Sequence, residues 1–160
     1  MKLHLSEDLA LPADAITHED LAWAAGLFEG EGTITIAVRN CDDTFRLVCI
    51  IGNTDRQVLD FFQSRWPGWY QPPYGERPGR KPSWSWTVAG PAAERFLREI
   101  GPAFRTDRVR KKCEIGLKFR SCQSRSARVH QAWGYKAAQR RLYQEMRDLN
   151  RRGAIEGESS

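Results

Sequence analysis

The stretch AAGLFEGEG, residues 24–32, runs directly into TITI, residues 33–36, and this junction decides how the chain is interpreted. Thr17 and the acidic residues after it predict a helix start, because a threonine caps free N–H groups and acids complement the helix dipole. The helix is predicted to stop at Gly30. The alternation of polar and apolar residues that follows predicts a strand with one apolar face.

The predicted helix carries small residues on one side and an acid at its end. Ala22, Ala25, Gly26 and Gly30 leave a face without bulk, and the four-residue spacing of the glycines places both on it. A second helix can therefore pack unusually close. Two such helices would bring two Glu31 carboxylates together, and their negative charges would repel each other. Divalent cations, which take hard oxygen ligands, would relieve that repulsion.

Acidic residues at the end of this helix need an explanation. An acid at a helix C-terminus opposes the dipole, so Glu29 and Glu31 are unfavourable there without a compensating cation or a role. A plain alternative is an ordinary C-terminal turn that happens to be rich in glycine and glutamate.

The rest of the chain continues the alternation of helices and strands. Periodicity and turn residues predict strands at 44–51, 69–71 and 83–88, and helices from Asp55 to about 65, over 91–100, from Thr106–Asp107 to about 120, and over 127–150. The order is α-β-β-α-β-β-α followed by two C-terminal helices. It predicts an α+β domain with a four-stranded antiparallel sheet covered by helices on one face.

Length predicts a single folded domain with flanking segments. A chain of 160 residues is one domain by size and can bury a core. We expect an N-terminal leader over 1–16, a core domain over 17–120, a C-terminal helix over 121–150 and a disordered tail over 151–160. No apolar stretch is long enough to span a bilayer and no signal peptide opens the chain, so we expect a cytoplasmic protein, with an organelle left open.

Charge is distributed unevenly along the chain. Residues 1–31 hold one lysine against seven acidic residues, whereas 103–160 hold fifteen basic residues against six acidic ones. A basic half suits a polyanion, since cations displace the counterions condensed on phosphates. The four cysteines form no CxxC pair and the three histidines are scattered, which argues against structural zinc. Cys49 and Cys113 fall within apolar patterns and are predicted to be buried thiols.

Residues 24–32 resemble the LAGLIDADG motif in its common variant ending Gly-Glu-Gly. The chain is similar over about residues 20–152 to single-motif LAGLIDADG homing endonucleases, particularly phage and bacterial members. Further matches are the strand end IIGNTD (residues 50–55), the aromatic strand around 84–86 and LNRRG (residues 149–153). The resemblance implies a homodimer joined through the motif helix, with an open saddle-shaped sheet over the DNA major groove. It also implies intron homing through metal-dependent double-strand breaks, with short 3′ overhangs, in a long and roughly palindromic target.

The resemblance also implies an active site. It assigns the metal ion, Mg²⁺ or another divalent cation such as Mn²⁺, to Glu31 and the neighbouring Gly30. Members usually carry a lysine near the start of the penultimate helix, and here Arg108, Arg110 or Lys111 could fill that position. Asn53 would be a polar residue that positions water, with a helix cap as the equal alternative.

Two sets of contact residues follow from the pattern and the resemblance. One face of the sheet should be polar, because Ile34 and Ile36 alternate with threonines and Trp84 and Trp86 alternate with serines. The predicted DNA contacts are Thr33, Thr35, Arg39, Asn40, Arg46, Gln71, Arg77, Arg80, Lys81, Ser83 and Ser85. The predicted dimer contacts are Ala22, Ala25, Gly26, Glu29 and Gly30.

The sequence bears on three alternative functions. The chain could be an inactive descendant that binds DNA as a repressor or splices introns as a maturase, and RNA would be a partner only in the maturase. An HNH nuclease needs clustered histidines, which His4, His18 and His130 do not supply. A module that uses the small-residue face only to dimerise would leave the basic half without a purpose.

Overall fold

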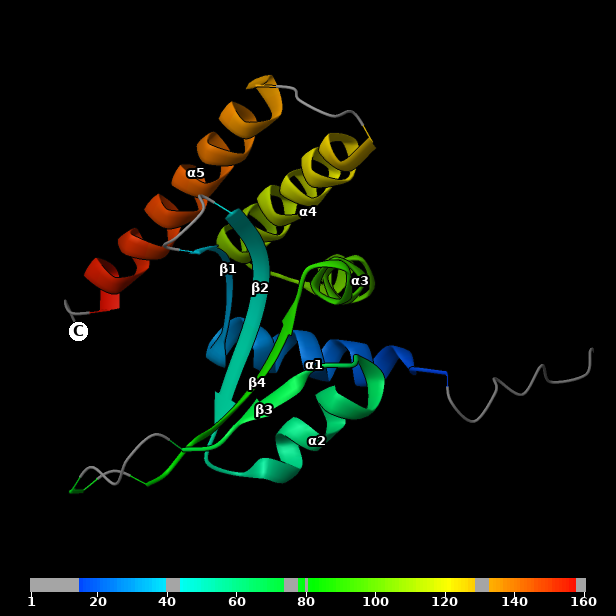
Figure 1. Ribbon diagram of the computed structural model, residues 1–160. Coiled ribbons are helices and arrows are strands. Elements are labelled where there is room, and N and C mark those ends of the chain that lie inside the picture. The colour runs from blue at the N-terminus through cyan, green and yellow to red at the C-terminus, as the bar shows by residue number, and fades with distance from the viewer. Residues whose placement is uncertain (1–14, 40–43, 74–77, 80, 129–132, 158–160) are drawn as a thin grey trace, which may run out of the picture.

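A computed structural model describes residues 15–39, 44–73, 78–79, 81–128 and 133–157 (Figure 1). The predicted element order and the α+β class are confirmed. The elements are α1 (His18–Glu31), β1 (Gly32–Arg39), β2 (Thr44–Asn53), α2 (Arg56–Arg65), β3 (Trp69–Gln71), β4 (Trp84–Ala89), α3 (Pro91–Ile100), the 3-10 turn η1 (Gly101–Ala103), α4 (Asp107–Arg128) and α5 (Trp133–Gly157).

Helix α1 begins and ends through local contacts. The Thr17 hydroxyl accepts a hydrogen bond from the Asp20 N–H at 3.0 Å, and the Asp20 carboxylate accepts one from the Thr17 N–H at 3.4 Å, so the start is a capping box. The helix passes straight into β1 at Gly32. A Cβ at Gly32 would lie 2.5 Å from the Phe28 ring, so only glycine allows this tight transition.

The four strands form one antiparallel sheet in the order β1-β2-β4-β3. The central pairing sets Ile51 opposite both Gly32 of β1 and Trp86 of β4. Helices α1, α2, α3 and α4 lie to one side of this sheet, and α5 runs beside the edge strand β1 (Figure 1). The predicted four-stranded sheet with one helix-covered face is therefore confirmed.

Aromatic rings fill the space between the sheet and its helices. Phe96 of α3 lies at the centre, with ring centroids 5.0 Å from Phe28, 4.9 Å from Trp66 and 5.5 Å from Trp86. These four side chains are fully buried, and edge-to-face pairs of this kind add stability beyond their buried area. The core thus fixes α1 against α3 and β4. Cys49 and Cys113 are buried thiols as expected, and burial raises the pKa of Cys113 to about 11.

The C-terminal helices differ from the prediction in their bounds. Helix α4 continues to Arg128 rather than ending near Arg120, so residues 121–128 belong to α4 and not to the last helix. Helix α5 continues to Gly157, so residues 151–157 are helical where a disordered tail was expected, and residues 158–160 lie outside the described residues. No Pro or Gly interrupts 121–128, and the two helices pack against each other as a hairpin (Figure 1). None of the described helices is long and apolar enough to cross a membrane.

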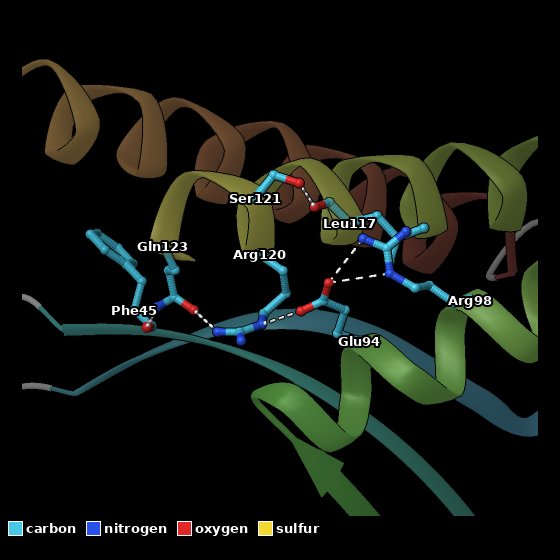
Figure 2. Close-up of polar contacts among 7 residues, drawn as sticks. All are labelled: Phe45, Glu94, Arg98, Leu117, Arg120, Ser121 and Gln123. Carbon is cyan, nitrogen blue, oxygen red and sulfur yellow. Dashed lines mark hydrogen bonds and ion pairs between the residues drawn. The ribbon is translucent and has the colours of Figure 1, made fainter. Parts of the chain in front are cut away.

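A polar network fastens α4 to the sheet and to α3 (Figure 2). Arg120 donates to the Glu94 carboxylate at 3.1 Å and to the Gln123 side chain at 2.7 Å, and Gln123 donates to the Phe45 carbonyl at 2.6 Å. Arg98 binds the other oxygen of Glu94 at 2.9 Å. These contacts extend α4 beyond Arg120, because Gln123 must stay helical to reach β2.

We expect loss of the Arg120 side chain to destabilise the fold. The side chains of Arg120 and Glu94 are only 14% and 22% exposed, so Arg120→Met leaves a carboxylate half satisfied and should lower the free energy of unfolding by about 2 kcal/mol. The exposed pair Arg95–Glu99 is the control, and Arg95→Met should cost about 0.5 kcal/mol or less. Urea denaturation measures both, and equal losses would contradict the assignment.

Candidate nucleic-acid interface and acidic site

The sheet divides into a buried face and an open face much as the alternation predicts. Ile34, Ile36, Trp86 and Val88 are buried toward the helices. On the other face, Thr33, Arg46 and Gln71 are exposed, while Thr35 and Ser85 are half-buried; Lys81 and Ser83, before β4, are exposed as well. Arg39 ends β1, whereas Asn40, Arg77 and Arg80 lie outside the described residues.

The open face is less polar than the sequence suggested. Val48 and Ile50 of β2 occupy its middle, and Trp69 of β3 stands exposed at its far side. Thr87, the polar residue between Trp86 and Val88, lies between Ile50 and Trp69 in the register. It is 2% exposed, with no partner for its hydroxyl among the described residues. This mixture of guanidinium, hydroxyl and apolar groups suits a base-pair edge, which offers acceptors, donors and the thymine methyl.

Arg46, near the start of β2, has an aromatic neighbour on that face. Its guanidinium carbon lies 5.9 Å from the centroid of Trp69, within the range of a cation–π contact. Arg46 of β2 lies opposite Ala37 of β1. Because Ala37 is small, the long Arg46 side chain has room to extend from the open face. Trp69 is a functional candidate that the sequence analysis missed, although its place beside a predicted contact, Gln71, was a usable signal.

Asn53 lies where β2 ends, as predicted. Its side-chain oxygen accepts the Asp55 N–H at 2.8 Å, and Asp55 in turn accepts the Gln57 N–H at 2.9 Å to cap α2. The structure therefore gives Asn53 a turn contact before the helix. Its amide NH₂ group has no partner among the described residues and is available for a further contact.

Helix α1 has two distinct faces. Ala24, Ala25 and Phe28 are buried in the core of their own chain. Ala22, Gly26 and Gly30 are exposed, and a Cβ built on either glycine would meet nothing within 4 Å. The small-residue face is therefore Ala22–Gly26–Gly30. Ala25 does not belong to it, because the packing of α1 on the sheet and on α3 turns that residue inward.

Glu31, the last residue of α1, stands at the end of the small-residue face. Its side chain is exposed, and no hydrogen bond or ion pair engages it within the described part of the chain. Gly30 beside it is exposed too. The described residues contain no group of three histidine, cysteine or acidic side chains that could hold a metal ion. One chain thus offers one free carboxylate at this point.

Glu29, a predicted dimer contact, has partners within its own chain. Its carboxylate accepts hydrogen bonds from the N–H groups of Arg105 and Thr106, both at 2.8 Å, and from the Thr106 hydroxyl at 2.9 Å. Burial raises the pKa of Glu29, but these bonds and the charge of Arg110 outweigh it and lower the pKa below 4.5. Glu29 therefore caps the start of α4 within its own chain.

The predicted basic partners lie in the first turns of α4, and each is engaged. Arg108 donates to the Leu149 carbonyl of α5 at 3.1 Å, and Arg110 donates to the Phe104 carbonyl at 2.8 Å. Lys111 lies 3.7 Å from Glu114. Lys112, which was not among the candidates, is half-buried, and burial together with the charge of Arg108 lowers its pKa.

This architecture is similar to that of several solved structures. The sequence matches no protein-family model, and no curated protein is detectably similar to it. Among solved structures, the group I intron-encoded homing endonuclease I-CeuI bound to DNA aligns with a TM-score of 0.60 and 14% identity over 82% of this chain and 68% of its own. The I-SmaMI LAGLIDADG homing endonuclease bound to cleaved DNA aligns with a TM-score of 0.62 and 16% identity over 78% of this chain and 42% of its own. The LAGLIDADG homing endonuclease I-GzeII in complex with its DNA target aligns with a TM-score of 0.62 and 15% identity over 89% of this chain and 46% of its own.

The chain has the LAGLIDADG homing endonuclease fold. It covers less than half of the I-SmaMI and I-GzeII chains and about two thirds of I-CeuI. In this fold the motif predicted at residues 24–32 is the C-terminal part of α1, and Glu31 stands at the junction with the sheet.

We expect the two acids at the end of α1 to differ sharply in their effect on stability. Glu29→Gln should lower the free energy of unfolding by about 1–2 kcal/mol at neutral pH, because charge-assisted bonds to the start of α4 are lost. Since the pKa of Glu29 is lower in the folded protein, its contribution is present above about pH 4.5 and lost as pH falls through the folded pKa.

Glu31→Gln is the matched control, two residues along the same helix. It removes the same charge from an exposed side chain without a described partner, so its unfolding curve should overlay that of the wild type. Thermal or urea unfolding between pH 7 and pH 3 measures both variants. Equal destabilisation by the two substitutions would contradict the capping role of Glu29.

Proposed function

We propose that this protein is a site-specific DNA endonuclease that acts as a homodimer and cuts both strands in the presence of Mg²⁺ or another divalent cation such as Mn²⁺. The observation that carries the proposal is the position of Glu31. An exposed carboxylate without a described partner stands at the end of an open small-residue face and directly before a strand of the open sheet. The likeness to DNA-bound homing endonucleases supports the proposal at the level of fold.

The dimer follows from the open face of α1. Ala22, Gly26 and Gly30 repeat every four residues along one side of the helix, and nothing in the described chain covers the two glycines. Trp23, which is 47% exposed, borders this face and packs its ring 5.0 Å from Phe61. Two copies of α1 packed through these residues would unite two sheets and two Glu31 side chains. This chain covers less than half of the longer I-SmaMI and I-GzeII chains, as expected if one copy corresponds to half of such an assembly.

The residues present fit a divalent metal ion. Mg²⁺ takes oxygen ligands, keeps several waters, and is held by one or two carboxylates together with substrate phosphates. Glu31 supplies one carboxylate per chain, and the backbone of Gly30 beside it is accessible. When bound, such an ion makes a nucleophile from water and stabilises charge on the phosphate oxygens.

The chain's own residues would position the substrate around Glu31. Thr33 and Thr35 follow it on β1, and Arg46 and Gln71 stand across the same open face, so these side chains would hold the major groove in register. The Asn53 amide would bind water or a phosphate oxygen through its NH₂ group. We propose that a basic residue of α4 assists there, because Thr106 at the start of α4 is bonded to Glu29, two residues from Glu31.

A second function has one observation in its favour. Two of the expected basic partners, Arg108 and Arg110, donate to backbone carbonyls of the protein itself, and the third, Lys111, lies 3.7 Å from Glu114. A chain that retained the saddle and lost the assisting cation would bind DNA without cutting, as a repressor, or would bind RNA as an intron-splicing maturase. Binding and cutting of a DNA duplex by the same preparation separate the repressor from the endonuclease.

Substitution of Glu31 tests the proposed chemistry. Purified wild-type protein with Mg²⁺ should cut both strands of a duplex carrying its own insertion-site junction. Glu31→Gln should slow cutting by about 10³-fold or more, because a metal ligand worth several kcal/mol is lost, while binding to the same duplex stays nearly unchanged.

Glu19→Gln, in the exposed first turn of the same helix, is the control and should cut like the wild type. Equal cutting by Glu31→Gln would remove Glu31 from the site. Tight binding of the junction without cutting by the wild type, in Mg²⁺ and in Mn²⁺, would favour the repressor.

A further inference from the structure

Helix α5 lies along the free edge of β1 and leaves a groove between them. Strand β1 is an edge strand, and the Asn150 side chain donates to the Ile34 carbonyl at 3.2 Å. Leu142 and Met146 of α5 are buried in the core, and the ring centroids of Tyr143 and Phe45 lie 5.2 Å apart. Helix α5 is therefore packed against the rest of the domain. Covering an edge strand in this way prevents unwanted strand pairing.

The groove is lined by cations and by sheet residues. Its β1 wall is formed by Thr35, Ile36, Ala37 and Val38, and its α5 wall includes Arg147 and Arg151. Both arginines are exposed, and no ion pair engages either within the described part of the chain. No acidic side chain lines the groove.

A backbone N–H of β1 also faces this groove. In an antiparallel pair the N–H and C=O of one residue point the same way, and the direction alternates along the strand. Because the Ile34 carbonyl faces α5, the N–H of Ile36 does so as well. Two guanidinium groups and the Ile36 N–H, with the Ile36 carbonyl beside it, thus line one groove, and phosphate oxygens accept hydrogen bonds from N–H groups of both kinds.

We propose that this groove binds the phosphate backbone of DNA beside the sheet saddle, through Arg147 and Arg151. The inference rests on the proposed DNA-binding function and extends it to a helix outside the sheet. The polar open-face residue Thr35 forms part of the same wall, so a duplex on the saddle would place one strand's phosphates along α5. These contacts carry affinity and orientation without reading sequence.

The salt dependence of binding tests the groove. Full-length protein is titrated onto a fluorescein-labelled, mixed-sequence duplex over a series of KCl concentrations, and fluorescence anisotropy gives Kd. Loss of two phosphate contacts in Arg147→Ala/Arg151→Ala should reduce the slope of log Kd against log[KCl] by about 1.8. The doubly conservative Arg147→Lys/Arg151→Lys should keep most of the slope.

Lys118→Ala/Arg141→Ala is the matched control, since it removes the same charge from the groove between α4 and α5. It should retain the wild-type slope. Equal slopes for both double alanine variants, with thermal unfolding confirming folded protein, would overturn the assignment while leaving DNA binding intact. A wild-type chain that binds no duplex at any salt concentration would overturn the proposed function and the groove with it.

Discussion

The packing of α1 constrains the rest of this structure. One side of the helix places Ala24, Ala25 and Phe28 in the core, and the opposite side leaves Gly26 and Gly30 uncovered. If both sides of the helix carried bulky apolar residues, the side that faces away from the core would expose apolar surface in the single chain. Small residues allow the same helix to pack in its own core on one side and to leave its other side open to close packing.

The end of α1 shows how the fold tolerates acids where the helix dipole disfavours them. Glu29 is compensated within the chain, since it accepts the N–H groups of Arg105 and Thr106 at the start of α4. Glu31 has no such contact in the described residues and points away from the core. Of two chemically identical side chains, one joins the end of α1 to the start of α4, and the other has no partner among the described residues. This division supports a functional role for Glu31 better than the glycine-rich motif does alone.

Local patterns in the sequence were sufficient to predict the fold but not the detailed contacts. Period-two alternation around Ile34 and Ile36 identified the buried face correctly, because the side chains of a strand necessarily alternate. The end of α4 was misplaced, since the contacts that extend it, from Gln123 to Phe45, join residues far apart in the chain. Ala25 was assigned to the wrong face because a run of small residues does not show which of them faces the core. The pairing of Glu29 with Thr106 could not be predicted either, because the two residues lie 77 positions apart in the chain.

The central claim is that two chains each supply one Glu31 to a shared site. Wild-type and Glu31→Gln protein can be mixed at constant total concentration, allowed to exchange subunits, and assayed for double-strand cutting of the junction duplex with Mg²⁺. If both carboxylates are required, the cutting rate falls as the square of the wild-type fraction. A rate that follows 2f − f², where f is the wild-type fraction, would mean that one Glu31 per dimer suffices. A rate in direct proportion to f would mean that each Glu31 acts independently, and either result would contradict the account.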